Sequence, residues 1–126
     1  MDKYTVFVYG TLMRGFHNSR LLKDAEFICK GSTIGSCYDL PYGFPAFIQQ
    51  GENIVLGELY SVDRETLESL DMLEGYNEMT DSGMYLRRLV DVVTIDGPKQ
   101  AYIYVWNKLL PLNSTMVKSN TLWKSL

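Results

Sequence analysis

The sequence predicts an α+β fold, in which a small mixed, partly closed β-barrel carries one main helix packed on it. Two observations support this prediction. About six segments are rich in β-forming residues and are separated by short turn sequences. Only one segment, DRETLESLDMLEG at 63–75, has a convincing helical period.

The first expected strand is YTVFV at residues 4–8, a run of β-forming residues. It ends on Tyr9-Gly10-Thr11-Leu12 instead of on a polar hairpin turn, and this ending is unusual. A loop continues to Asn18, and the following NSRLL segment has room for one or two turns of helix. The unusual end of the strand makes the tetrapeptide a candidate for function.

Two longer strands are expected next, AEFICKGSTIG at 25–35 and AFIQQGENIVLGELYSV at 46–62. The segment DLPYGFP between them is rich in Pro and Gly, which favours a turn. In the helix that follows, Asp63 is placed to cap the start and Gly75 to end it. The last strands, MYLRRLVDVVTI and QAYIYVW, flank the turn sequence DGPK and therefore predict a hairpin.

The length of 126 residues predicts one domain spanning 1–126, large enough to bury about two thirds of the surface of its unfolded chain. No repeat or linker divides the sequence. The segment 107–126 has no clear period, so we expect a C-terminal tail that is either docked or partly mobile.

Charge and composition limit the partners. The formal net charge is −3 and neither sign is gathered into a block, which makes nucleic acid a poor partner. No signal peptide and no membrane-spanning segment is predicted, so we expect a soluble, cytoplasmic protein without a membrane partner. Cys29 and Cys37, with a single His, match no metal motif; we interpret them as reduced core thiols, with a disulfide as the alternative. These features leave the oligomeric state open.

The helix at 63–75 places one carboxylate toward the core. In a helical projection, Leu67, Leu70 and Leu73 form an apolar stripe, and Glu74 falls inside it. Asp71 falls on the side predicted to be solvated, together with Arg64, Glu65, Glu68 and Ser69. A carboxyl that is taken out of water has a raised pKa, which makes Glu74 a candidate general acid/base.

Two alternatives exist for Glu74. The helix can fray at Gly75 and release the side chain to solvent, or Arg87 or Arg88 can pair with it. Glu58 and Glu78 are the rival carboxyls for an acid/base role.

The tetrapeptide after the first strand predicts an anion site. Consecutive backbone N–H groups of Gly10, Thr11 and Leu12 can point into one concavity and bind a carboxylate or an oxyanion. The alternative is an ordinary turn that Thr11 caps. Arg14 is a further candidate for binding a carboxylate, and Tyr42 and Tyr76 are candidates for lining a pocket, whereas His17 is expected at the surface.

Five sequence blocks together resemble the gamma-glutamylcyclotransferase superfamily. They run in order from about residue 4 to 106, and the most specific are YGTL at 9–12 and LEGY at 73–76: VFVYGTLMRGFHNSRLL, LPYGFPAFI, VLGELYSVD, LDMLEGYNEMTDSGMYLRR and AYIYVW. The similarity is to the small branch that includes gamma-glutamylamine cyclotransferase and the AIG2-like proteins.

The resemblance implies that Tyr9, Gly10, Thr11 and Leu12 form the substrate-binding loop and that Glu74 is the catalytic acid/base. Tyr85 and Arg87, which follow in the motif, are the remaining predicted substrate-binding residues. The implied reaction is attack of the α-amine of a gamma-glutamyl group on its own side-chain carbonyl, which forms 5-oxoproline and expels an amine, with no cofactor and no metal.

The resemblance leaves the substrate open among a gamma-glutamyl amino acid, a gamma-glutamyl amine, epsilon-(gamma-glutamyl)lysine and a protected antibiotic intermediate. A hypothesis of a different class is a non-catalytic module that binds a small acidic metabolite or a peptide end. Glu74 in the apolar stripe favours the enzyme, because a site for an anion would gain from the absence of a carboxylate.

Overall fold

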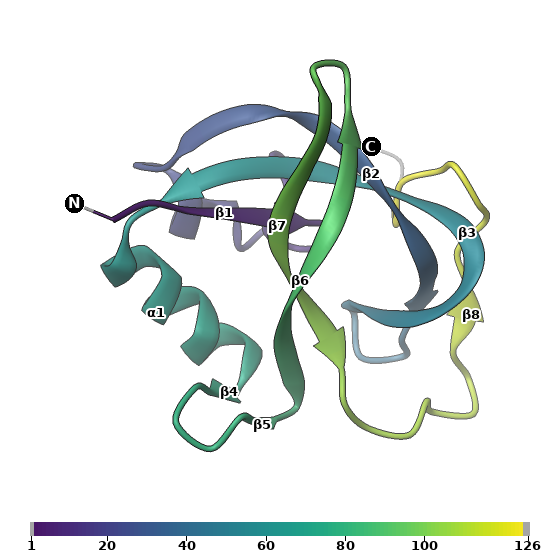
Figure 1. The fold of residues 1–126 in the computed structure, drawn as a ribbon. Coiled ribbons are helices and arrows are strands. Elements are labelled where there is room, and N and C mark those ends of the chain that lie inside the picture. The colour runs from purple at the N-terminus through teal and green to yellow at the C-terminus, as the bar shows by residue number, and fades with distance from the viewer. Residues whose placement is uncertain (1, 125–126) are drawn as a thin grey trace.

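The computed structural model describes residues 2–124, which form one curled sheet, a small second sheet and one α-helix (Figure 1). The elements in chain order are β1 (Tyr4–Val8), the 3-10 helix η1 (Ser19–Leu22), β2 (Glu26–Asp39), β3 (Pro45–Val62), α1 (Arg64–Glu74), β4 (Tyr76–Asn77), β5 (Ser82–Gly83), β6 (Tyr85–Thr94), β7 (Gly97–Trp106) and β8 (Thr115–Met116).

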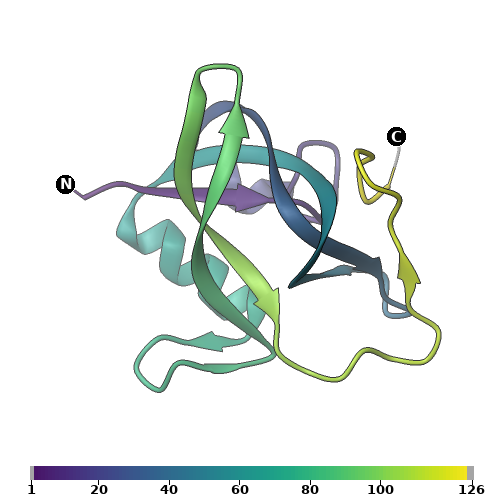
Figure 2. The same cartoon turned by 45° about the vertical axis from the view of Figure 1, so that its right-hand side comes forward.

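The main sheet has the strand order β3-β1-β7-β6-β2-β8, and β2 also pairs with β3. This extra pairing joins the first strand of the order to the next-to-last one, so the sheet curls back on itself, as the two views in Figures 1 and 2 show. Two contacts in the ring have a single paired position each: Val6↔Tyr102 between β1 and β7, and Ser32↔Val93 between β2 and β6. The predicted α+β class with a partly closed barrel is confirmed.

The two long strands are bent where their register shifts. Gly35 pairs with Asn53, but the next residue, Ser36, pairs with Ile48, so a short part of β3 has no partner on β2. The β6–β7 hairpin is confirmed, with a small correction to its turn. Thr94 pairs with Gly97, so the turn lies at Ile95 and Asp96 and the strand already includes Gly97 and Pro98.

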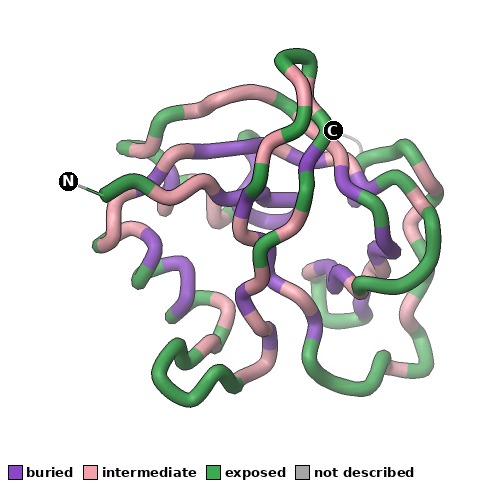
Figure 3. Tube along the Cα trace, in the orientation of Figure 1, coloured by how far each residue is buried: buried purple, intermediate pink, exposed green. Residues whose placement is uncertain are grey.

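Both ends of helix α1 have the predicted caps. The Asp63 side chain accepts a hydrogen bond from the Thr66 amide at 2.8 Å, and Gly75 closes the helix in the left-handed conformation with φ 68°. Leu67 and Leu70 are fully buried against the sheet, and the inner side of α1 is coloured as buried in Figure 3.

The prediction that Asp71 faces solvent is wrong. Its residue surface is only 7% exposed, because the flank of α1 that carries Asp71 lies against β6 and meets the guanidinium of Arg87. The helical projection placed Asp71 on the solvated side of the helix, and tertiary packing covers that flank.

The C-terminal tail is docked along much of its length. Strand β8 pairs with the end of β2, and Thr121 forms a bridge with Val55. The ring of Trp123 is buried, its Nε1 donates a hydrogen bond to Asp39 at 2.9 Å, and it packs 5.5 Å from the ring of Phe16. The tail therefore contacts the loop that follows β1. Cys29 and Cys37 are free thiols, as predicted, but only Cys37 is buried in the core, whereas Cys29 is half-buried.

Candidate active site

A cavity of about 240 Å³ lies where the end of β1, the last turn of α1 and the starts of β3 and β6 meet. It brings together all but one of the predicted site residues. Its walls are formed by Phe7, Val8, Tyr9, Gly10, Thr11, Leu12, His17, Asn18, Phe44, Pro45, Leu73, Glu74, Met84, Tyr85 and Tyr104.

Gly10 is required by close packing at this loop. A Cβ atom at this position would lie 2.6 Å from Cγ of Pro45, well inside contact distance. The φ angle of Gly10 is not positive, so the reason for glycine is space and not backbone conformation. The absence of a side chain allows the loop to lie directly on the start of β3.

The backbone amides of the loop are available to a ligand. The carbonyls of Gly10 and Thr11 accept hydrogen bonds from the amides of Met13 and Asn18, each at 3.0 Å. The amides of Gly10, Thr11 and Leu12 have no hydrogen-bond acceptor among residues 2–124, although all three residues are buried and line the cavity. Buried amides without a protein acceptor are suited to binding an anion.

Glu74 is the last residue of α1, and its carboxyl lines the same cavity. Burial raises the pKa of this carboxyl to about 7. Within residues 2–124 no hydrogen bond and no ion pair to Glu74 is formed, so the carboxyl is free to meet a ligand. Both alternatives for this residue are wrong, because the helix is closed at Gly75 and both Arg87 and Arg88 pair with other carboxylates.

Two tyrosines form rigid walls around Glu74. The Tyr9 hydroxyl donates to the carbonyl of Tyr104 at 2.8 Å and accepts from the amide of Phe47 at 3.1 Å. The Tyr85 hydroxyl donates to the carbonyl of Pro45 at 2.5 Å. Burial raises the pKa of both phenols, and the neighbouring Glu74 raises it further. Both hydroxyls are therefore neutral and bound to the backbone.

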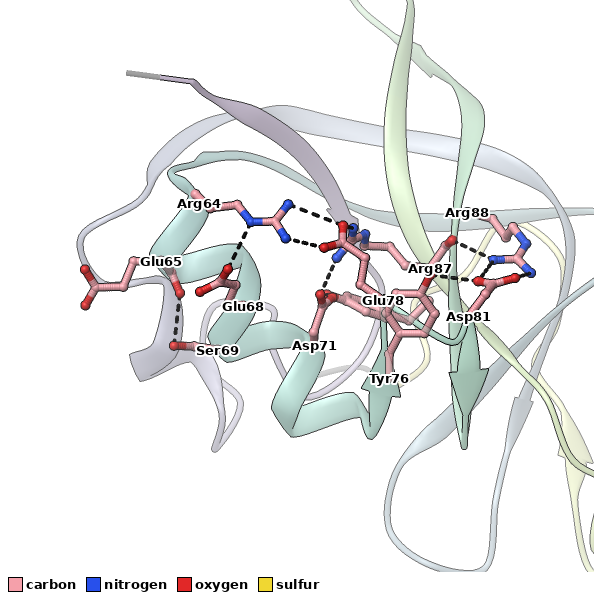
Figure 4. Close-up of polar contacts among 11 residues, drawn as sticks. Arg64, Glu65, Glu68, Ser69, Asp71, Tyr76, Glu78, Asp81, Arg87 and Arg88 are labelled. Atoms are coloured by element: carbon pink, nitrogen blue, oxygen red, sulfur yellow. Dashed lines mark hydrogen bonds and ion pairs between the residues drawn. The ribbon is translucent and has the colours of Figure 1, made fainter.

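Arg87 lies outside the cavity. Its guanidinium is buried and forms ion pairs with Asp71 of α1 and Glu78 of the β4–β5 loop, as Figure 4 shows. The Tyr104 hydroxyl donates to the same Asp71 carboxylate at 2.6 Å. Tyr85 and Arg87 share a face of β6, but Arg87 lies two residues further along the strand, a distance of roughly 7 Å. The structure does not bring Arg87 together with the other predicted substrate-binding residues.

The rival carboxyls have partners elsewhere. Glu58 accepts hydrogen bonds at 3.0 Å from the amide of Arg14 and from the hydroxyl of Tyr60. Glu78 is held by Arg64 and Arg87. Neither carboxyl lines the cavity, which leaves Glu74 as the acidic group of the site.

The sequence of this chain matches a family model described as "Gamma-glutamyl cyclotransferase, AIG2-like" over residues 6–125. The chain belongs to this family. It is 34% identical over 105 residues to gamma-L-glutamyl-butirosin B gamma-glutamyl cyclotransferase of Niallia circulans, covering 82% of this chain and 67% of that protein. It is 31% identical over 119 residues to the gamma-glutamylaminecyclotransferase of Rattus norvegicus, covering 79% of this chain and 75% of that protein.

A solved structure shares the fold. The AIG2-like protein of Mus musculus superposes with a TM-score of 0.78 at 26% identity, covering 96% of this chain and 90% of that chain. The present chain is thus an enzyme of the gamma-glutamylcyclotransferase type. Across residues 2–124 the cyclotransferase has no helix that is long and apolar enough to span a bilayer, and no group of three or more His, Cys, Asp or Glu residues placed to hold a metal ion.

The sequence-based prediction missed several residues of the cyclotransferase cavity. Asn18, Leu73, Met84 and Tyr104 line it, and of these Leu73 and Met84 lie beside the predicted site residues Glu74 and Tyr85 in the sequence. His17, expected at the surface, is exposed and also borders the cavity. No local pattern distinguishes these residues, because the cavity forms only when distant segments meet. Tyr42 and Tyr76 do not line it.

Proposed function

We propose that this cyclotransferase converts a gamma-glutamyl amide to 5-oxoproline and a free amine by intramolecular aminolysis. One observation carries the proposal: Glu74, a carboxyl with a pKa of about 7 and no protein partner among the described residues, lines the same cavity as the free amides of Gly10, Thr11 and Leu12. A proton-transfer group and an anion site thus border one small space.

The proposed reaction needs one group to move protons and one to hold negative charge. Glu74 takes a proton from the α-ammonium of the substrate, and the free amine then attacks the γ-carbonyl carbon. The carbonyl oxygen becomes an oxyanion, which the amides of the 10–12 loop stabilise by hydrogen bonds. Glu74 gives this proton to the leaving nitrogen and then takes the second proton, which the attacking nitrogen loses as the lactam forms. When the γ-carbon–nitrogen bond has broken, Glu74 passes that second proton to the released amine, which leaves as an ammonium ion, so the carboxylate is regenerated.

The size of the cavity supports a folded glutamyl group. At about 240 Å³ it is smaller than most sites for drug-sized ligands, and the fixed rings of Tyr9 and Tyr85 form part of its wall. Holding the five-carbon chain in a bent form brings the amine near the carbonyl before reaction. Such positioning of an internal nucleophile accounts for much of the acceleration in ring-closing reactions.

The wall around Glu74 favours an amine as the leaving group. Phe44, Leu73 and Met84 are apolar, and no Lys or Arg is among the described residues that line the cavity. A carboxylate on the leaving group, as in a gamma-glutamyl amino acid, would find no fixed cation there. The names of the relatives from Niallia circulans and Rattus norvegicus, which refer to a gamma-glutamyl derivative of butirosin B and to gamma-glutamylamines, support the same class.

A panel of gamma-glutamyl compounds tests the proposal. The purified protein is incubated with gamma-glutamyl ethylamide, epsilon-(gamma-glutamyl)lysine and gamma-glutamyl dipeptides, and 5-oxoproline is measured by mass spectrometry. We expect 5-oxoproline and free amine in equal amounts from at least one amide, and more from the amide than from the dipeptides. Absence of 5-oxoproline across the panel would support a non-catalytic binding module instead.

A further inference from the structure

Asn18 occupies the position before η1, but its side chain does not cap that helix. An Asn at this position normally accepts a hydrogen bond from an amide of the first helical turn. Here its Nδ2 instead donates to the hydroxyl of Thr11 at 2.8 Å, and its backbone amide donates to the carbonyl of Thr11 at 3.0 Å. Two hydrogen bonds thus turn Asn18 away from η1 and toward the loop of the active site.

This arrangement leaves the other end of the side-chain amide without a partner. Within residues 2–124, Oδ1 of Asn18 accepts no hydrogen bond. It is not sealed in the interior either, since among the described residues only Oγ of Ser114 is both fully buried and unpaired. Asn18 is half-buried and lines the cavity, so a carbonyl-type acceptor is available to a ligand there.

The other polar groups of the cavity are mostly hydrogen-bond donors, or hydroxyls whose protons are already used. The loop amides are donors, and the phenols of Tyr9 and Tyr85 already donate their protons to backbone carbonyls. The carboxyl of Glu74 and Oδ1 of Asn18 are acceptors on cavity side chains to which no donor among residues 2–124 is bonded. A gamma-glutamyl group has a carboxylate and a carbonyl, which suit donors, and an α-amino group, whose N–H bonds need acceptors.

We propose that Oδ1 of Asn18 binds the α-amino group of the gamma-glutamyl substrate and orients it for attack, a role that rests on the proposed function. Asn18 takes no proton in the reaction; it accepts a hydrogen bond from the N–H that stays on the nitrogen, while Glu74 removes the two protons that leave in turn. With one N–H held by Asn18, the nitrogen lone pair is directed at the γ-carbonyl. The hydroxyl of Thr11 acts through Asn18, because it fixes the orientation of the amide.

Ligand binding in the Glu74→Gln background, where turnover is blocked, tests this assignment. Three probes differ by one group each: gamma-glutamyl ethylamide, its analogue without the α-amine (N-ethylglutaramate) and its analogue without the α-carboxylate (N-ethyl-4-aminobutanamide). We expect Asn18→Ala to weaken the two probes that carry the amine by about tenfold to a hundredfold, as for loss of a hydrogen bond to a charged group. Binding of N-ethylglutaramate should change less than twofold.

Two controls separate contact from structure. Asn113→Ala, at an exposed position of the tail, should leave all three affinities unchanged. Asn18→Asp keeps an acceptor oxygen that the Thr11 hydroxyl can still hold, so its preference for amine-bearing probes should survive, which provides the readout if Asn18→Ala does not fold.

Three outcomes would overturn the assignment: an equal loss for all probes, a loss that follows the carboxylate, or no binding of any probe. Each leaves the cyclotransferase proposal intact if the wild-type protein still forms 5-oxoproline. Absence of that product, in contrast, would count against the reaction itself.

Discussion

Arg87 of β6 and Asp71 of α1 form a buried ion pair. Asp71 lies three residues before Glu74 on the same helix. The Tyr104 hydroxyl donates to the same carboxylate, and the backbone carbonyl of Tyr104 accepts from the hydroxyl of Tyr9. One continuous series of contacts therefore connects the helix that carries the acid/base with the start of the substrate loop.

Arg87→Gln should destabilise the fold by roughly 3–5 kcal/mol, because it leaves the Asp71 carboxylate buried without its counter-charge. Adding Asp71→Asn should recover part of this loss, since the second change removes the stranded charge. Urea unfolding of the wild type, both single variants and the double variant measures the coupling. Additive losses would show that the two side chains do not depend on each other.

The same variant separates the two roles considered for Arg87. Because its guanidinium is held by Asp71 and Glu78 outside the cavity, folded Arg87→Gln should keep a KM within about threefold of the wild type. The assay is run well below the melting temperature of the variant. A KM increase of tenfold or more in the folded variant would show that Arg87 binds the substrate.

Glu74→Gln should lower turnover by at least the ~10²–10⁴ usually ascribed to general acid–base catalysis, because an amide cannot accept and return a proton. Initial rates of 5-oxoproline formation measure the effect. Glu68→Gln is the matched control, since Glu68 is exposed and, within residues 2–124, pairs only with Arg64 on the outer face of the same helix. Near-normal turnover in Glu74→Gln would rule out the acid/base assignment.

The raised pKa of Glu74 predicts a pH-dependent difference in stability. Its pKa is about 7 in the folded protein against 4.5 for an ordinary glutamate, so the folded state binds more protons between these values and loses stability as pH rises. Glutamine does not titrate. As pH rises from 4.5 to 8, the free energy of unfolding of Glu74→Gln minus that of the wild type should therefore increase by at most about 3 kcal/mol. A difference independent of pH, measured by urea unfolding, would contradict this pKa.

The free amides of the loop predict where the product binds. Addition of 5-oxoproline should shift the backbone amide signals of Gly10, Thr11 and Leu12 in ¹H–¹⁵N NMR spectra, because its carboxylate or ring carbonyl accepts hydrogen bonds from them. The amides of the exposed β6–β7 turn at Ile95 and Asp96 are the internal control. Shifts confined to that turn would place the anion site elsewhere.

The docked tail predicts a long-range effect on the substrate loop. Trp123→Ala removes the ring that packs on Phe16, and we expect a loss of about 3 kcal/mol in stability and a higher KM, because Phe16 belongs to the loop that ends at Asn18. Leu112→Ala, in the same tail but fully exposed, should be silent in both measurements. Thermal melts measure stability, and steady-state kinetics measure KM. An unchanged KM in Trp123→Ala would show that the tail does not affect substrate binding by the loop.

The amino-acid sequence by itself determined the elements whose signals are local. A run of β-forming residues set β1, and Asp63 and Gly75 set the ends of α1, because caps and strand propensity depend on neighbours in the chain. The same 3.6-residue period placed Glu74 on the inner face of the helix. The YGTL and LEGY motifs pointed to the family.

Tertiary structure alone decided which side chains share the cavity and which are held elsewhere. The helical projection could not show that β6 covers the flank of α1 at Asp71, or that Arg87 is held there instead of at the substrate. Nor could it place Tyr104 and Asn18 beside Glu74, since segments far apart in the chain meet only when the sheet curls and β2 pairs with β3. Periodicity reports the face of one element, whereas the partner of that face depends on long-range packing, which no local pattern encodes.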